Sequence, residues 1–283
     1  MQTRHRFQHA HPPYAPWATR AVALLAAVGL TASLTACDAP RLAGRAEAEQ
    51  EMSACESAYV DASSLASTVD GDGGEPLLAR YIASLTLPSA WLEVAAQCPE
   101  RFGEGAMFSA RAELVQTSLA AKLGQDDSQQ TRIARLDGVD SLAVDAQALL
   151  TMAQAEDRAG FAVEVLAARG ISDADLATSD NHKTTAQQLV SLAGVEPNSD
   201  ADPRQKAYAI DALIGDSGTV TDSATGLEVP VVAAVEMDCA RTEAAAWSGT
   251  DAESAAILAD LVAQHAYQAF QLGYPTGDFA LFE

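Results

Sequence analysis

The sequence predicts an all-α protein with a helical bundle in its C-terminal half. Aromatic residues make up only 6% of the 283 residues, while alanine, the strongest helix former, recurs throughout. Apolar residues recur at three- and four-residue spacing, which is the period of a helix with one buried face. No segment alternates convincingly between apolar and polar residues. The one β-like run, residues 229–232, contains Pro230.

The charge balance excludes a general nucleic-acid binder. Lysine and arginine number 17 and aspartate and glutamate 39, so the formal net charge is −22. Binding to phosphates needs a basic stripe, and we therefore expect no nucleic-acid partner. The apolar fraction of 48% and the charged fraction of 20% are ordinary for a globular chain with a buried core.

The first 36 residues predict a secretory leader. Arg4, Arg6 and Arg20 make its start basic, and an apolar run follows at residues 21–34. A run of this length is too short to span about 30 Å of hydrocarbon, which needs roughly 20 residues. We therefore expect residues 1–36 to be a signal peptide, with an uncleaved anchor helix as the alternative.

Residues 34–37 read Leu-Thr-Ala-Cys, which resembles a bacterial lipobox. The resemblance implies that Cys37 receives a diacylglycerol, that the leader is cut before it, and that the new amino terminus is acylated with a fatty acid such as palmitate. Two or three acyl chains hold a protein firmly on a membrane. A cleaved signal with a chance cysteine is the competing interpretation. Residues 37–46 would then be a lipid-anchored tether.

Three cysteines follow Cys37, namely Cys55, Cys98 and Cys239. Disulfides persist in exported proteins, and three thiols allow one bridge among themselves. We favour a bridge between Cys55 and Cys98, because both lie in the N-terminal half. Cys239 sits in an apolar helical stretch and is expected to be a small buried hydrophobe.

Residues 47–130 predict an N-terminal helical region. Helical periodicity covers three segments, the second of which is interrupted near Pro88 because proline lacks a backbone donor and restricts its predecessor. These segments are residues 45–67, 76–97 and 104–123. The polar stretch at residues 125–131 is the candidate boundary to the next region.

Residues 131–283 predict four longer helices in two hairpins. They cover residues 141–169, 172–194, 224–247 and 250–273. Two expected capping boxes open the second and fourth helices, Ser172 with Asp175 and Thr250 with Glu253. A long crossover at about 195–225 joins the hairpins and contains a short helix opened by Asp202-Pro203. Two hairpins joined by one long crossover are typical of a ferritin-like four-helix bundle.

Several short stretches in residues 141–273 carry a family resemblance. They are Ala-Glu-Asp-Arg at 155–158, Asn-His-Lys-Thr-Thr-Ala at 181–186, Ala-Tyr-Ala-Ile at 207–210, Val-Thr-Asp at 220–222, and Glu236 before Thr-Glu-Ala-Ala-Ala-Trp at 242–247. With them the segment resembles the actinobacterial ferritin-like domain of unknown function. The resemblance covers slightly under half of the chain and implies a fold but no activity.

Four residues form a candidate metal site in this bundle. Glu156 and Glu236 lie on its first and third helices, and His182 and His265 on its second and fourth. Carboxylate two-metal centres in such bundles need a glutamate three residues before each histidine. Serine and valine occupy those places, so the bridging carboxylates are missing. We therefore expect no bound metal or other cofactor, and a mononuclear metal site of these four residues is the alternative.

The sequence thus favours a cell-envelope lipoprotein that binds or scaffolds and is not an enzyme. It is expected on the extracytoplasmic face of the cell membrane, held by its N-terminal lipid, with an unidentified envelope protein as a possible partner. No catalytic residues are predicted, since no nucleophile motif or phosphate loop is present. The rival function is that of a mononuclear metal protein.

Overall fold

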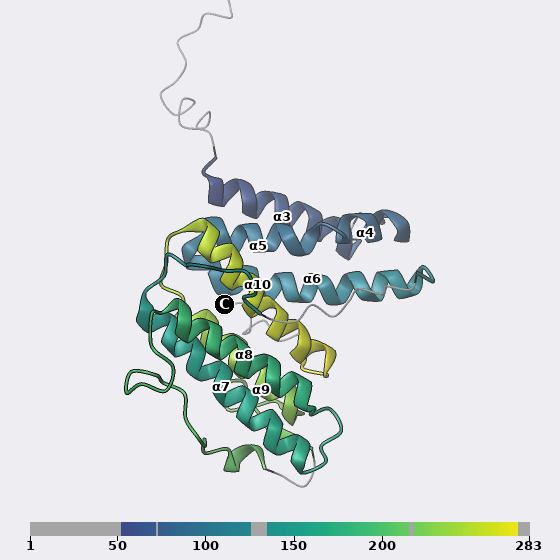
Figure 1. The fold of residues 1–283 in the computed structure, drawn as a ribbon. Coiled ribbons are helices and arrows are strands. Elements are labelled where there is room, and N and C mark those ends of the chain that lie inside the picture. The colour runs from purple at the N-terminus through teal and green to yellow at the C-terminus, as the bar shows by residue number, and fades with distance from the viewer. Residues whose placement is uncertain (1–51, 72, 126–134, 215–217, 277–283) are drawn as a thin grey trace, which may run out of the picture. The chain divides into compact units, whose positions relative to one another are not determined.

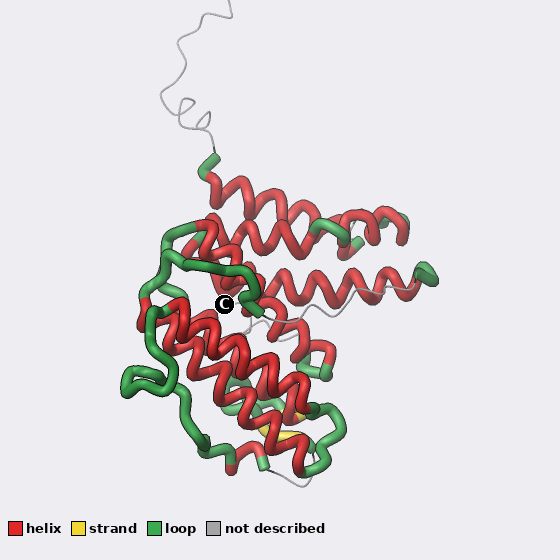
Figure 2. Tube along the Cα trace, viewed as in Figure 1, coloured by secondary structure: helices red, strands yellow, loops and turns green. Residues whose placement is uncertain are grey.

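The structure is a computed structural model that describes residues 52–71, 73–125, 135–214 and 218–276. The predicted leader, Cys37 and the tether lie outside these residues. The chain from Met52 onward forms one compact unit. Its described part is mostly helical with one two-stranded sheet, which confirms the predicted all-α class (Figure 2). No helix of the described residues is long and apolar enough to cross a membrane.

The described residues of the N-terminal region form four helices and a short 3-10 turn. They are α3 (Ala54–Asp70), α4 (Leu77–Ser84), α5 (Leu87–Gln97), η2 (Pro99–Arg101) and α6 (Phe102–Lys122). Ser53 caps α3 in a capping box with Glu56, which satisfies two backbone donors of its first turn. Pro88 lies in the first turn of α5, where its missing N–H is not needed. The predicted break near Pro88 is therefore the junction between α4 and α5.

Cys55 and Cys98, the pair that the sequence favoured, are joined by a disulfide. Their Cα atoms are 5.0 Å apart and 43 positions separate them in the chain. The bridge ties the start of α3 to the end of α5. Between these helices and α6 the Trp91 ring stacks on Phe108, with centroids 4.5 Å apart, and meets the edge of Tyr59. The N-terminal helices therefore have an aromatic core of their own.

The C-terminal region contains the four expected long helices. They are α7 (Ala146–Ala168), α8 (Leu176–Leu192), α9 (Val231–Ala246) and α10 (Ala252–Gln271). The predicted caps at Ser172 and Thr250 are wrong. Asp175 caps α8 and Asp251 caps α10, each accepting from a backbone N–H three residues on. An aspartate carboxylate is at least as good an N-cap as a hydroxyl, and here the chain becomes helical only after it.

The crossover between α8 and α9 contains a β-hairpin, which the sequence analysis did not predict. Strands β1 (Thr219–Thr221) and β2 (Glu228–Pro230) pair in antiparallel register, and η3 (Asp211–Leu213) precedes them. The short helix expected after Asp202 is absent from the described crossover. The Asp202 carboxylate instead accepts from the backbone N–H and the guanidinium of Arg204, and residues 202–205 are not helical.

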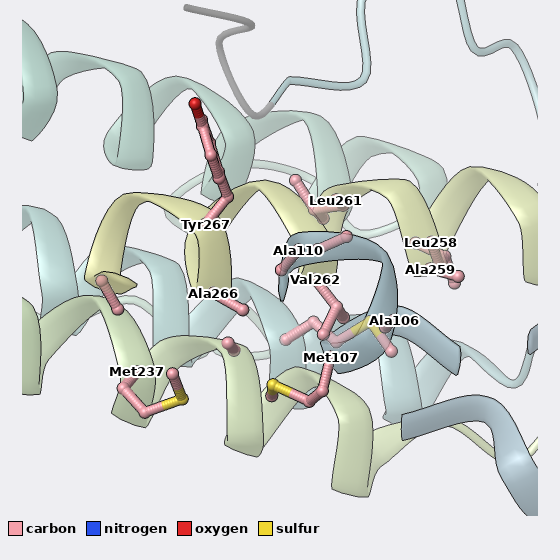
Figure 3. Packing of buried hydrophobic residues seen from close by; sticks show 14 of the residues in the cluster. Ala106, Met107, Ala110, Met237, Leu258, Ala259, Leu261, Val262, Ala266 and Tyr267 are labelled. Atoms are coloured by element: carbon pink, nitrogen blue, oxygen red, sulfur yellow. The ribbon is translucent and has the colours of Figure 1, made fainter. Parts of the chain in front are cut away.

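The C-terminal helices share a core with the N-terminal ones. α7 lies beside α8, and α9 packs against both α7 and α10 (Figure 1). α10 also packs against α5 and α6, so the two regions meet along this helix. Figure 3 shows the contact, with Met107 of α6, Met237 of α9 and Val262 of α10 in one buried cluster. The predicted boundary at residues 125–131 falls largely outside the described residues, and no separate compact unit begins there.

Candidate metal centre

The structure brings the four predicted residues together in the middle of the α7–α10 bundle. His182 Nδ1 lies 2.5 Å from Glu156 Oε2, and its Nε2 lies 3.2 Å from Glu236 Oε1. His265 contacts the same two carboxylates, with Nε2 3.0 Å from Glu156 Oε1 and Nδ1 3.1 Å from Glu236 Oε2. The carboxylates are 0% exposed and the imidazoles 2% exposed. The four side chains thus form a closed, buried ring.

The ring has two distinct ends. The imidazoles stack with their planes 10° apart and their centroids 4.8 Å apart. Each carboxylate therefore bridges one nitrogen of each imidazole, Glu156 at one end and Glu236 at the other. An ion binds to imidazole nitrogens and not to the ring faces, so only the two ends are suitable for coordination.

Two further side chains gather at the Glu156 end. Donor atoms of Glu156, His182, Cys239 and His265 lie within 4.8 Å of one another. Glu243 Oε2 lies 3.9 Å from His265 Nε2, and neither oxygen of this fully buried carboxyl has a hydrogen-bond donor. The Glu156 end therefore combines carboxylate oxygens, imidazole nitrogens and a thiol sulfur that could act as metal ligands.

Glu243 was not among the site residues predicted from the sequence, and Cys239 was predicted only as a small buried hydrophobe. The signal was their spacing on α9. Cys239 follows Glu236 by three residues and Glu243 follows Cys239 by four, which places all three on one helix face. We use the name core cluster for the six residues at this site. They are Glu156, His182, Glu236, Cys239, Glu243 and His265.

The two positions that lack a bridging glutamate serve packing. Ser179, three residues before His182, is buried and its hydroxyl donates to the Gly160 carbonyl oxygen over 2.8 Å. Val262, three residues before His265, is fully buried in the apolar core. The site therefore cannot form the two-metal centre that needs two additional bridging carboxylates.

The core cluster strongly shifts the pKa values of its members. Burial alone would raise the pKa of Glu156 and Glu236, but the imidazolium charges and their hydrogen bonds outweigh it and lower each pKa to about 2. Burial opposes the protonated imidazole, yet the carboxylate charges and hydrogen bonds raise the pKa of His182 to about 9. Burial also opposes the protonated form of His265, but the Glu156 charge and the hydrogen bonds to Glu156 and Glu236 raise its pKa well above the ordinary value. Two imidazolium ions thus face two carboxylates.

The remaining two groups are held neutral. Burial and the nearby Glu156 charge raise the pKa of Glu243 well above its ordinary value. As a carboxylic acid, Glu243 can donate to Glu156, whereas as a carboxylate it lacks a donor. Burial and the neighbouring carboxylates likewise raise the pKa of the Cys239 thiol. In the metal-free protein the charges of the core cluster therefore balance.

These shifts predict that the metal-free protein loses stability as the pH rises above neutrality. The two imidazolium ions add their full contribution to the free energy of unfolding below the ordinary histidine pKa of 6.5. For His182 this contribution is lost as the pH rises through its pKa of about 9. The raised pKa values of Glu243 and Cys239 also lower the free energy of unfolding as the pH rises, because the folded protein favours their protonated forms. The contribution of Glu156 and Glu236 is complete above 4.5 and is lost only towards pH about 2. Urea midpoints measured in a chelator should fall between pH 7 and 10, and a constant midpoint contradicts the prediction.

Gly160 sets the distance between α7 and α8 at this site. A Cβ here would lie 3.0 Å from the Ser179 carbonyl oxygen and 3.2 Å from His182 Cβ. Gly160→Ala is therefore expected to lower the free energy of unfolding by about 1–3 kcal/mol, because α8 must move away. Gly103→Ala is the matched control, since its Cβ would meet Ala244 at an ordinary 3.6 Å. Equal urea midpoints for the two variants contradict the close approach.

No protein-family model, no curated protein and no solved structure matches the chain.

Proposed function

We propose that the chain is a metal-binding protein of the cell envelope that holds one divalent transition-metal ion at the Glu156 end of the core cluster. The observation that carries the proposal is the gathering of donors there. Glu156, His182 Nδ1 and His265 Nε2 meet there from α7, α8 and α10, and Glu243 Oε2 of α9 lies 3.9 Å from His265 Nε2. Carboxylate oxygens and imidazole nitrogens are the ligands that such ions take in proteins.

Glu243 argues most directly for an ion. A fully buried carboxyl without a hydrogen-bond donor is costly, because it loses its hydration without compensation. A cation at the Glu156 end would satisfy it, together with Glu156. In the metal-free protein, Glu243 can only offer its own carboxylic acid proton to Glu156.

Glu236 takes a different part in this proposal. Its carboxylate bridges the opposite nitrogens, His182 Nε2 and His265 Nδ1. A carboxylate behind a metal-bound imidazole orients the ring and increases its basicity. The alternative set of four equal ligands is thereby refined: Glu236 positions the two imidazoles, and Glu243 is a ligand in its place.

The arrangement also supports a ferritin-like bundle with one metal instead of two. Glutamates come from α7 and α9 and histidines from α8 and α10, and the long connection joins the second and third of these helices. The leader and Cys37 support placement on the extracytoplasmic face of the cell membrane through an N-terminal lipid. Cys37→Ala should release the protein from the membrane or leave the leader uncut, and unchanged detergent partitioning together with an unchanged mass contradicts the anchor.

Thermal melts of the full-length chain test the metal proposal. Protein stripped with a chelator should bind one Zn²⁺, Mn²⁺ or Fe²⁺ per chain, and at a hundredfold excess over Kd it should gain about 2.7 kcal/mol. For a chain of this size that corresponds to an increase in Tm of about 5–10 °C. His265→Ala and Glu156→Gln should abolish the shift, whereas Glu236→Gln should weaken binding about 10–100-fold.

The matched control is Glu164→Gln, which changes a half-exposed glutamate of α7 paired with Lys183. It should leave metal binding unchanged. If neither bound metal nor a Tm shift is found for the unmodified chain, the metal proposal is wrong.

That result would favour a second candidate, a metal-free scaffold whose core is held by the ring itself. The observation behind it is the complete pairing of four imidazole N–H groups with four carboxylate oxygens. Such a ring satisfies its own polar atoms, as buried networks require. Its function would be binding or scaffolding of another envelope protein.

A further inference from the structure

Cys239 is the one member of the core cluster that offers a sulfur atom; the others offer oxygen or nitrogen. Its side chain is 1% exposed, and it is the free cysteine of the described residues. Its Sγ lies within 4.8 Å of donor atoms of Glu156, His182 and His265, a set that does not include Glu236. The thiol therefore belongs to the Glu156 end of the ring.

A cavity of about 320 Å³ is lined in part by Cys239. It lies between α7, α9 and the crossover, and Cys239 is the residue of the core cluster that lines it. The wall is mainly aliphatic and includes Ala159, Ala162 and Ile210. Arg158 and Asp238, whose side chains are half-exposed and paired, also line it. Cys239 thus belongs both to the cavity wall and to the core cluster.

We propose that Cys239 is a thiolate ligand of the ion, which makes the centre a mixed nitrogen, oxygen and sulfur site. The inference rests on the proposed metal-binding function. On binding, a metal–sulfur bond forms, the S–H bond breaks, and its proton leaves to solvent through the adjoining cavity. Soft thiolate ligands favour Zn²⁺ and Co²⁺ over Mn²⁺ and Mg²⁺, which prefer oxygen. The site therefore selects a thiophilic ion.

Co²⁺ spectroscopy distinguishes a sulfur ligand from the rest of the site. The full-length chain is purified in detergent in a Cys37→Ser background, so that Cys239 is the one thiol outside the disulfide. Adding Co²⁺ should produce visible ligand-field bands and an intense near-ultraviolet thiolate-to-metal charge-transfer band. In Cys239→Ser and Cys239→Ala the visible bands should remain, the charge-transfer band should disappear, and the preference for Zn²⁺ over Mn²⁺ should fall at least about tenfold.

The outcomes separate the two proposals. Visible bands without a charge-transfer band in the chain that retains Cys239 overturn the thiolate ligand and leave the metal centre in place. Absence of any Co²⁺ spectrum, together with no competition by Zn²⁺, overturns the metal centre itself. The spectrum of the chain that retains Cys239 decides the question even if both variants misfold.

Discussion

Glu156→Ala is expected to lower the free energy of unfolding of the metal-free protein by about 3–5 kcal/mol. The Glu156 carboxylate accepts one hydrogen bond from each buried imidazole, over 2.5 Å from His182 and 3.0 Å from His265. Its loss leaves two buried N–H donors at this end and one uncompensated positive charge in the core. Glu243 lies 3.9 Å from His265 Nε2, too far to replace the lost acceptor without movement.

Urea unfolding followed by circular dichroism in a chelator measures this loss. Glu164→Ala is the matched control on the same helix, because Glu164 forms a half-exposed pair with Lys183 of α8. Exposed pairs contribute about 0–1 kcal/mol, so this variant should unfold close to the unmodified chain. Glu156→Gln retains the volume and should remain destabilised, since its amide group cannot neutralise an imidazolium. Equal losses for Glu156→Ala and Glu164→Ala contradict the buried ring.

Removing the disulfide is expected to have the next largest effect. The bridge between Cys55 and Cys98 closes a loop with a sequence separation of 43, and loops of this size stabilise a fold by about 2–4 kcal/mol through the unfolded state. The variant Cys55→Ser/Cys98→Ser should therefore unfold at lower urea concentration. The effect should concentrate on α3, which the bridge ties to the end of α5.

Hydrogen exchange locates the effect within the molecule. Amide protection should fall first in α3, while α7 to α10 should keep theirs, because the core cluster and its apolar surroundings do not involve the disulfide. The matched control is a reducing agent. It should destabilise the unmodified chain and leave the double serine variant unchanged. Equal urea midpoints for the unmodified chain and the double serine variant, both measured without reducing agent, contradict the contribution of the bridge.

The positions of the long helices were predictable because their signals are local. Apolar spacing, helix-ending glycines and Pro88 act within a few residues, and all of the predicted long helices are present with shifted ends. The residues that cap the helices were harder to predict from the sequence. Ser172 and Asp175 both suit an N-cap, and the choice between them depends on where α8 meets α7.

The β-hairpin of the crossover shows the limit of local signals. Its strands have three residues each, too few for alternation to be recognised in the sequence. Their position is held from outside, since the Asp222 carboxylate next to β1 accepts from Arg241 of α9 and from Tyr274. These partners lie 19 and 52 residues away along the chain.

By itself the sequence determined the helical class, the helix order, and the four residues Glu156, His182, Glu236 and His265, because helix period and residue type suffice for these. The tertiary structure decided what the four residues do. It placed the imidazoles face to face, separated the two carboxylates onto opposite ends, and buried Glu243 and Cys239 beside only one of them. A glutamate on a helix is solvated unless other helices cover it, and that covering depends on packing between segments distant in the chain.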